Sequence, residues 1–371
     1  MTKLGDIATY VNGFAFKPSD WSNEGLPIIR IQDLTGNSYQ ANRYNGTYHP
    51  KYEVNDGDVL ISWSASLVVY VWKGEKAVLN QHIFKVVFDK SEVDKNFFVH
   101  QVQNILENAA SEAHGATMKH LTKPVFDALP FYLPNIEKQK EIASVLDKVT
   151  ELIALRKEQL AKLDQLVKSR FIELFENTNH PRVALIDLIK EGAGLSYGIV
   201  QPGDDGTGDM GVLRPVDMVD GRISTASIKY INRSIGDGFR KTELTGDELL
   251  ITVRGTTGIT ALTDSRFRGM NVTRGIAVIR YDRNKIDPVY LNAYLNTQES
   301  HRYIQEHTRG ATLQQINLSD LRIQEIMLPP MDQQRQLAAF VEQTDKSKLA
   351  IQQSLDKLEL LKKSLMQEYF G

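Results

Sequence analysis

The sequence predicts an α+β protein with two α/β-mixed domains that have β-rich cores. Two long antiparallel coiled-coil helices separate the domains, and a pseudo-two-fold tandem duplication relates the two halves. The stretch GATMKHLTKPVFDALPFYLP (115–134) returns as GATLQQINLSDLRIQEIMLP (310–329). The 195-residue offset continues without a gap to residue 370, with 15 of 61 positions identical. A repeat of this length is far longer than a solenoid unit, so each period should hold a domain and an appendage.

Each period begins with a segment of mixed secondary structure. Runs rich in β-branched and aromatic residues have strand length and are bounded by turn residues; they include DVLISW (58–63), HIFKVVF (82–88), ELLITV (248–253) and GIAVIRY (275–281). Weaker matches pair PIIRIQDL (27–34) with GVLRPVDM (211–218), and NDGDVLISW (55–63) with LTGDELLITV (244–253). We therefore expect one domain at 1–135, a helix at 136–178, a second domain at 179–330 and a second helix at 331–371.

The segments 137–175 and 333–370 contain no Gly or Pro, and their apolar residues recur at spacings of three and four, which predicts helices with an apolar stripe. Pro134 and the pair Pro329-Pro330 mark the boundary before each helix. A rod of roughly 55–60 Å needs a partner for its stripe, and the other copy is the nearest one. The alternative is two core helices of one large domain, but such helices are on average much shorter. The residues expected in the coiled coil are Leu152, Leu160, Leu163, Val167, Ile351, Leu355, Leu358 and Leu365.

Composition excludes several classes of protein. The chain has no cysteine, which excludes disulfides and thiolate zinc sites and fits a reducing compartment. The N-terminus MTKLGDIATY has no apolar signal core, and no apolar run reaches the roughly 18 residues that span a membrane. We therefore expect a cytoplasmic protein without a membrane partner. A net charge of −2 argues against a surface that neutralises nucleic acid everywhere, but it leaves room for a local basic site.

The start of each long helix carries a family resemblance. LPNIEKQKEIASVL (133–146) and LPPMDQQRQLAAFV (328–341) resemble the Pro-Pro-Leu-x-Glu-Gln-x-x-Ile element of type I restriction–modification specificity subunits. In the first copy Asn135 replaces the second proline. The preceding GATMKHL and GATLQQI, and the pair GDVLISW and GDELLITVRG, are similar to that family as well. The resemblance covers essentially the whole chain and includes its duplicated order.

This resemblance implies a non-catalytic subunit that supplies DNA specificity to an enzyme complex. Its two domains would be target recognition domains, each reading one half of a bipartite target in double-stranded DNA. Its helices would set the distance between the half-sites and dock two methyltransferase subunits, and restriction or translocase subunits are further partners that the family allows. The chain itself would bind no cofactor, since S-adenosylmethionine, ATP and Mg²⁺ would belong to the partner subunits.

A DNA reader needs cations for phosphates and planar donors for base edges. Neither domain is basic overall, since 1–135 holds 12 Lys/Arg against 14 Asp/Glu and 181–330 holds 18 against 18. Arginines nevertheless gather in 251–280, where Gly and Thr suit close approach to a phosphate and Arg suits guanine O6 and N7. The alternative is a solvated hairpin. The DNA-binding residues predicted here are Arg254, Thr256, Thr257, Arg266, Arg268 and Arg274.

The matching stretch of the first domain, 61–85, contains no arginine, and two different half-sites would require such a difference. Its candidates are Ser62, Trp63, Ser64, Ser66, Lys73, Gln81 and His82, although a tryptophan here is more often a core residue. Both Gly-Ala-Thr loops offer polar side chains, and Gln can pair bidentately with adenine. The alternative is that these loops only form the turn into the next strand. Their candidates are Thr117, Lys119 and His120 in the first loop, and Arg309, Thr312, Gln314 and Gln315 in the second.

Catalytic motifs are not found in the sequence. It has no Asn/Asp-Pro-Pro-Tyr/Phe methyltransferase motif, no Walker A loop and no histidines at metal-ligand spacing. GTGDMG (206–211) matches G-x-G-x-x-G, but the acidic residues around it oppose a pyrophosphate. An enzyme with fused specificity domains would need a catalytic domain for which the duplication leaves no room. Two alternatives to the restriction–modification subunit stay open: a coiled-coil scaffold without DNA specificity, and the specificity subunit of a methyltransferase-only system.

Overall fold

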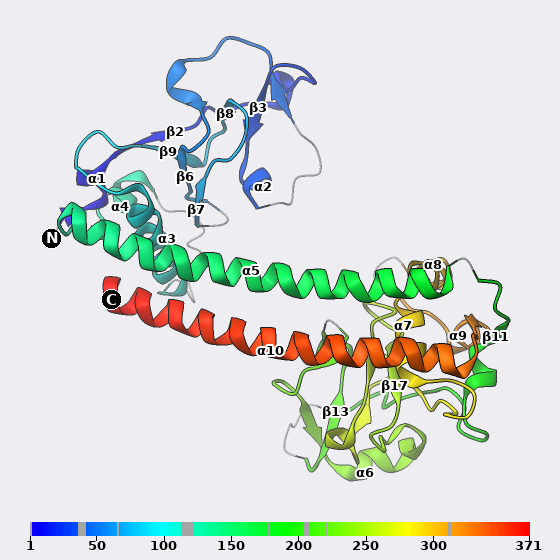
Figure 1. The fold of residues 1–371 in the computed structure, drawn as a ribbon. Coiled ribbons are helices and arrows are strands. Elements are labelled where there is room, and N and C mark those ends of the chain that lie inside the picture. Colours follow the sequence, from blue (N-terminus) through cyan, green and yellow to red (C-terminus); the bar gives the residue numbers. More distant parts are fainter. Residues whose placement is uncertain are drawn as a thin grey trace. The chain divides into compact units, whose positions relative to one another are not determined.

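The computed structural model describes residues 2–35, 42–64, 67–112, 122–176, 178–203, 208–219, 221–310 and 313–371 (Figure 1). By its internal contacts the chain divides into two compact units. Unit 1 comprises Met1–Glu158 and Gln352–Gly371, and unit 2 is Gln159–Ile351. Both long helices cross this division, so the domain boundaries expected from the sequence stay a prediction. None of the helices in the described ranges combines the length and the apolar character that a membrane span requires.

Unit 1 is built around two four-stranded sheets. The first has the order β2-β9-β6-β7 and is antiparallel, and the second has the order β4-β3-β8-β5, with β3 and β8 parallel. The strands are β1 (Thr2–Lys3), β2 (Thr9–Asn12), β3 (Leu26–Ile29), β4 (Arg43–Tyr44), β5 (Glu53–Val54), β6 (Val59–Ser62), β7 (Val68–Val71), β8 (Ala77–Leu79), β9 (Ile83–Val87) and β10 (Pro130–Phe131). The helices are α1 (Leu4–Ile7), η1 (Pro18–Asp20), α2 (Ile31–Leu34), η2 (Pro50–Tyr52), α3 (Lys95–Glu112) and α4 (Lys123–Asp127).

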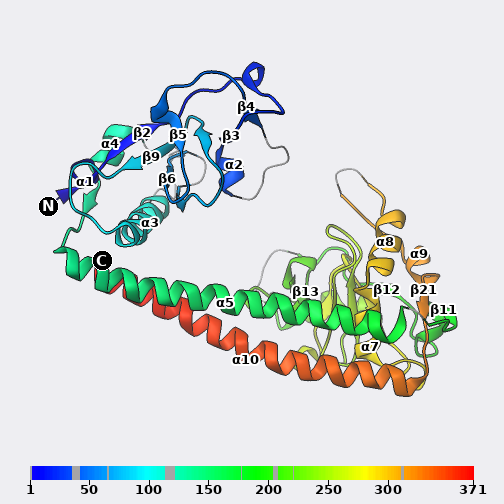
Figure 2. The same cartoon turned by 45° about the horizontal axis from the view of Figure 1, so that its top comes forward.

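The main core of unit 1 lies between its first sheet and α3. Ile61 and Phe84 from the sheet and Phe97 from α3 are buried there. Ile142 of α5 (Ile136–Phe175) and Met366 of α10 (Met331–Phe370) belong to the same core. The long helices are therefore part of the hydrophobic core of this unit, and Figure 2 shows α3 beside the first part of α5.

Unit 2 repeats this arrangement. Its main sheet has the order β12-β20-β17-β18, and a second sheet has the order β16-β13-β19, with β13 and β19 parallel. The strands are β11 (Arg182–Ala184), β12 (Ser196–Tyr197), β13 (Met210–Leu213), β14 (Met218–Val219), β15 (Arg222–Ile223), β16 (Lys229–Ile231), β17 (Leu249–Thr252), β18 (Thr260–Leu262), β19 (Asn271–Val272), β20 (Ile276–Ile279) and β21 (Glu325–Met327). The helices are η3 (Leu185–Leu188), η4 (Pro215–Asp217), α6 (Arg233–Gly236), η5 (Asp237–Thr242), η6 (Ser265–Phe267), α7 (Pro288–Leu295), α8 (Gln298–His307) and α9 (Leu318–Arg322).

The core of unit 2 again includes both long helices. Ile251 of β17, Tyr290 of α7, Phe175 of α5 and Leu337 of α10 are buried in one cluster. The predicted α+β class, with a duplicated order of strands and helices, is confirmed.

The two long helices are also confirmed, at 40 residues each. Within each unit they run antiparallel. In unit 1, Lys157 of α5 lies 2.9 Å from Glu359 of α10. In unit 2, Asp164 of α5 lies 2.5 Å from Lys348 of α10, so higher numbers on one helix again meet lower numbers on the other.

The inward faces of α5 and α10 follow a heptad pattern. In α5 the less exposed positions alternate by four and three along 142, 146, 149, 153, 156, 160, 163 and 167, and in α10 along 337, 341, 344, 348, 351, 355, 358, 362 and 365. This period of 3.5 residues is typical of a left-handed coiled coil. Leu152 is a correction: it is 43% exposed, because the pattern passes through Val149 and Ile153. The other expected residues, Leu160, Leu163, Val167, Ile351, Leu355, Leu358 and Leu365, lie on the pattern.

A buried glutamine joins each globular part to the start of a long helix. Gln139 and Gln334 are each 1% exposed. Each side-chain oxygen accepts the backbone N–H of an aspartate next to a domain helix, at 2.8 Å. Each amide nitrogen donates to a proline carbonyl just before the long helix, also at 2.8 Å. The partners are Asp94 and Pro134 in unit 1, and Asp287 and Pro329 in unit 2.

Candidate nucleic-acid interface

The main sheets of the two units share one framework, so their positions can be matched residue by residue. Ser62 at the end of β6 pairs with Ile83 at the start of β9. Thr252 at the end of β17 pairs in the same way with Ile276 at the start of β20. Ser62 is therefore equivalent to Thr252, and Ile83 to Ile276.

This framework corrects the sequence match between GDVLISW and GDELLITV by one residue. Asp58 accepts the N–H of Asn55, three residues earlier, at 2.9 Å. Glu248 accepts the N–H of Thr245 in the same way, at 2.8 Å. Asp58 and Glu248 thus hold the same turn before the same strand, and the glycines that the letters align are not equivalent.

Arg254 and Arg274 lie together at one end of the unit 2 sheet, which we name the first end. Arg254 follows β17, and Arg274 and Gly275 form the two-residue turn before β20. The N–H of Val253 donates to the carbonyl of Gly275 at 2.8 Å, so the two arginines flank one hydrogen bond. Arg254 is half-buried and Arg274 is exposed. Neither side chain makes a hydrogen bond or ion pair with another residue in the described part of the chain.

The second Gly-Ala-Thr loop reaches the same first end. Gln315 exchanges two backbone hydrogen bonds of 2.8 Å with Arg309 and forms a β-bridge with Arg254. The carbonyl of Gln314 accepts the N–H of Gly255 at 2.9 Å. The side chain of Arg309 is 73% exposed. The structure therefore brings this loop beside the residue that follows β17.

The threonines of this region differ in their surroundings. Thr256 is exposed, whereas the hydroxyl of Thr257 shares a hydrogen bond of 3.1 Å with that of Thr308. Thr256 is therefore better placed than Thr257 to meet an external acceptor. Thr312 lies outside the described residues.

Arg266 and Arg268 lie at the opposite end of the unit 2 sheet, beside the start of β17, which we name the second end. Both follow β18, which ends at Leu262, and Leu262 pairs with Leu249 at the start of β17. Arg254 instead follows the end of β17, and four strand residues span about 13 Å. The structure thus divides the predicted arginines between two ends of the sheet and does not gather them on one surface.

At the second end, protein groups already engage the arginines. Arg266 binds Asp264 through Nε and a terminal nitrogen, at 3.0 and 2.7 Å. This contact lowers the pKa of Asp264 and raises the pKa of Arg266. Arg268 donates to the carbonyl of Thr245 at 3.3 Å. A guanidinium whose charge is balanced by a carboxylate gains less from a phosphate, so Arg266 is a weaker candidate. Arg268 contacts only a neutral carbonyl and keeps its net charge.

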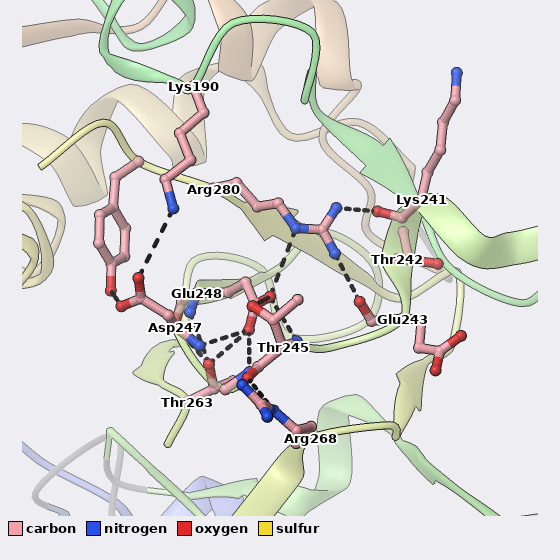
Figure 3. Close-up of polar contacts among 12 residues, drawn as sticks. Lys190, Lys241, Thr242, Glu243, Thr245, Asp247, Glu248, Thr263, Arg268 and Arg280 are labelled. Carbon is pink, nitrogen blue, oxygen red and sulfur yellow. Dashed lines mark hydrogen bonds and ion pairs between the residues drawn. The ribbon is translucent and has the colours of Figure 1, made fainter. Parts of the chain in front are cut away.

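Glu248 forms the centre of the second end, and its side chain is fully buried (Figure 3). It accepts the hydroxyls of Thr245 and Thr263 at 2.7 and 2.9 Å. Nε of Arg280 lies 3.5 Å away. Burial by itself raises the pKa of this carboxyl, but hydrogen bonds from Thr245, Thr263 and the N–H of Asp247 outweigh it, so the pKa of Glu248 is lowered. Arg280 therefore belongs to a structural network of the fold.

In unit 1 the first end carries Ser64 and Gln81. Ser64 follows β6 as Arg254 follows β17, and the turn Gln81–His82 precedes β9 as the turn at Arg274 precedes β20. The N–H groups of Gln81 and Arg274 donate to equivalent carbonyls, each two residues past a strand of the same sheet. The acceptors are Phe14 after β2, at 2.8 Å, and Ile199 after β12, at 2.9 Å. Gln81 is exposed and Ser64 is 6% exposed. His82 has a left-handed φ of 73°.

Two further candidates of unit 1 are engaged in the fold. Ser62 is fully buried, and its hydroxyl donates to the carbonyl of Ser64 at 3.1 Å. The ring of Trp63 stacks on Phe84 with centroids 5.7 Å apart, and its Nε1 donates to Asn12 at 3.2 Å. Both residues stabilise the sheet, although the sequence suggested them for DNA contact.

Lys73 lies at the second end of the unit 1 sheet. It follows β7, whose last residue Val71 pairs with Val59 at the start of β6. Lys73 is exposed, so a phosphate contact there would come from a different part of the unit than Gln81. The candidates Ser66, Thr117, Lys119 and His120 lie outside the described residues.

The sequence did not single out the loop after β13, which also reaches the first end of unit 2. A Cβ on Gly275 would lie 2.6 Å from Cγ of Pro215, so glycine is needed for Pro215 to pack against the turn of Arg274. Val216, next to Pro215, is 69% exposed. The match of PIIRIQDL with GVLRPVDM is the sequence signal for this loop, and by itself it indicates only the duplication.

The groups at the first ends can recognise a ligand by hydrogen bonds and charge. Guanidinium and amide groups are planar donors that suit base edges, and the flanking backbone and exposed threonine suit phosphates. In the described ranges no group of three or more His, Cys, Asp or Glu residues could hold a metal ion.

Comparisons with known proteins point to one family. The family model of the type I restriction modification DNA specificity domain matches residues 1–165 and 208–361. The EcoBI specificity subunit of Escherichia coli is 25% identical over 371 residues, covering 92% of this chain and 78% of that protein. The MjaVIII specificity subunit of Methanocaldococcus jannaschii is 24% identical over 47% of this chain and 41% of its own length.

Solved structures share the fold. The S subunit of a type I restriction–modification system from M. genitalium matches with a TM-score of 0.56 and 12% identity, over all of this chain and 95% of that one. A chain from a structure of type I R-M complex assembly matches with a TM-score of 0.53 and 16% identity, over all of this chain and 96% of that one. The chain therefore belongs to the family of type I restriction–modification DNA specificity subunits, which are the non-catalytic members of those systems.

Proposed function

We propose that this subunit reads a bipartite target in double-stranded DNA, with one half-site for each unit. The observation that carries the proposal is one backbone framework bearing different side chains at its first end. Unit 1 places Ser64 and Gln81 where unit 2 places Arg254 and Arg274. Gln81, Arg254 and Arg274 are base-reading types, whereas Ser64 is a small side chain that is 6% exposed, and such a difference is what two different half-sites require.

The long helices would dock two methyltransferase subunits and set the distance between the half-sites. Their outward faces support docking, because large apolar side chains stay exposed in unit 1: Leu152 and Leu155 on α5, and Leu360 and Leu361 on α10, are 43%, 45%, 69% and 45% exposed. Exposed apolar residues in one region are typical of a protein interface. Leu152, which is off the heptad pattern, fits this outer role.

The catalytic steps would then belong to partners. We propose that methyltransferase subunits hold S-adenosylmethionine, and that ATP and Mg²⁺ are used by restriction or translocase subunits where these join. The net charge of −2 supports a shared DNA interface in which partner subunits supply much of the phosphate contact. DNA in the cytoplasm would be the substrate of the assembly.

The test is methylation-sensitive long-read sequencing of DNA from cells with and without this chain, with its methyltransferase partner present in both. We expect a split motif that is methylated only when the chain is present. No chain-dependent methylation would favour the coiled-coil scaffold. A split methylation motif in cells that lack any restriction subunit would fit the methyltransferase-only system.

Binding measurements test the sharing of phosphate contacts. We expect the isolated chain to bind target DNA more weakly than the assembled complex at physiological salt, with a shallower dependence of affinity on salt. Equal affinity and equal salt dependence for chain and complex would refute the shared interface.

A further inference from the structure

A comparison of the first ends of the two units can distinguish positions that read a base from positions that bind a phosphate. The phosphate backbone is the same at any half-site, so a position that only binds phosphate has no reason to differ between the units. A base-reading position has to differ when the half-sites differ. At the two matched positions unit 2 has two arginines, whereas unit 1 has Ser64 and Gln81, neither of them a cation.

We infer that Arg254 and Arg274 read a G·C base pair in the half-site of unit 2, an inference that rests on the proposed function. An arginine fork presents two donors to O6 and N7 of guanine, which is the commonest specific contact in the major groove. Neither side chain makes a hydrogen bond or ion pair with another described residue, so both guanidinium groups keep their donors for the acceptor-rich edge of guanine.

The local backbone holds both arginines in place for this task. The turn that carries Arg274 is closed by a bond from the N–H of Ile276 to the carbonyl of Thr273, at 3.0 Å. Its other side is anchored by the N–H of Arg274 to the carbonyl of Ile199, at 2.9 Å. Arg254 is held between this turn and the second Gly-Ala-Thr loop. Rigid attachment limits the entropy lost on binding a base edge.

Unit 1 has a different chemistry at the same place. Gln81 occupies the exposed turn position of Arg274, and a glutamine amide can donate to and accept from N7 and N6 of adenine. The expected base pair for unit 1 is therefore A·T. The two units together would read unlike bases through equivalent positions.

The experiment uses the complete complex, with this chain co-expressed with its cognate methyltransferase subunit. The variants are Arg254→Gln, Arg274→Gln and Gln81→Ala. Arg240→Gln is the control, because Arg240 is 78% exposed and paired only with Asp237 among the described residues. Long-read sequencing then gives the methylated motif and the methylated fraction for each base at each position.

We expect either arginine variant to lower the preference for one G·C pair of one half-site by about 5- to 150-fold. Gln81→Ala should relax an A·T pair in the other half-site, and Arg240→Gln should change neither. A uniform loss at all sites with an unchanged motif would overturn the inference, since that is the pattern of a phosphate contact. If Arg274→Gln and Gln81→Ala relaxed base preference in the same half-site, the assignment of one half-site to each unit would be wrong.

A second measurement keeps the inference testable if a variant fails to fold. Each guanine of the half-site is replaced in turn by 7-deazaguanine, which lacks the N7 acceptor, and binding by the wild-type complex is measured. We expect one replacement to weaken binding at least about 5-fold. No effect at any guanine would overturn the inference while the split motif stands. A wild-type chain that gives no split motif would overturn the proposed function itself.

Discussion

Replacing Gln334 by leucine tests how the recognition part of unit 2 is attached to its long helix. The change removes the acceptor for the N–H of Asp287 and the donor for the carbonyl of Pro329, both at 2.8 Å. Each backbone group that loses its partner in a buried site costs about 1–3 kcal/mol. The apolar side chain recovers part of this, so we expect the free energy of unfolding to fall by about 3 kcal/mol.

The assay is urea unfolding followed by amide hydrogen exchange of Asp287, which should speed up in the variant. Gln333→Leu is the matched control, because Gln333 is the same residue one position away and only partly buried. Gln139→Leu should repeat the effect in unit 1 at the amide of Asp94. Equal free energies of unfolding for Gln334→Leu and Gln333→Leu, within about 0.5 kcal/mol, would refute the idea that Gln334 attaches the long helix to the globular part.

Three further predictions concern the buried network, a histidine and the helices. Glu248→Gln should lower the free energy of unfolding by about 3 kcal/mol at pH 7. Because the pKa of Glu248 is lowered in the folded protein, this difference from wild type should narrow as pH falls below about 4.5. A difference in urea midpoints that does not change with pH would contradict this. Burial lowers the pKa of His100 despite its 2.7 Å contact with Asp147, so an NMR titration should give a value below 6.5, whereas a value above it would contradict this. Since the unfolded chain then binds the proton more readily, His100 should reduce stability as pH falls below about 6.5. One heptad inserted at 156–159 adds roughly 10 Å of helix, which is the length of about three base pairs. The insertion should change the spacing between the half-sites or destroy assembly. An unchanged spacing with full activity would show that the helices do not set this distance.

The long helices and the duplication could be predicted from the sequence, because both depend on local and periodic signals. A stripe at spacings of three and four, with prolines just before it, leaves few alternatives to a helix. The apolar stripe alone does not determine which positions face inward, and Leu152 shows why. Leu152 and Ile153 are both apolar, and only packing against the other helix shows that the heptad pattern passes through Ile153.

The candidate site could be predicted only in part, because residue type does not show which end of a strand a loop joins. Arg254 and Arg268 lie within one short stretch of sequence, yet they lie at opposite ends of the sheet. Arg254 follows β17 and Arg268 follows β18, and these two strands are antiparallel. Glu248 was not singled out at all. Its role depends on donors gathered by the turn and by the neighbouring strand, and a one-residue shift in the alignment hid its equivalence to Asp58.

The arginines that cluster in the sequence do not form one basic surface in the fold. The stretch 251–280 holds five arginines and one acid, which looks like a basic DNA-binding loop. Arg266 pairs with Asp264 and Arg280 with Glu248 at the second end, so their charges are balanced within the protein. Under the proposed function, specificity in unit 2 would depend on Arg254 and Arg274, whose side chains have no partner among the described residues. A duplicated framework can keep its buried network and change its target through these positions, since substitutions there remove no buried partner.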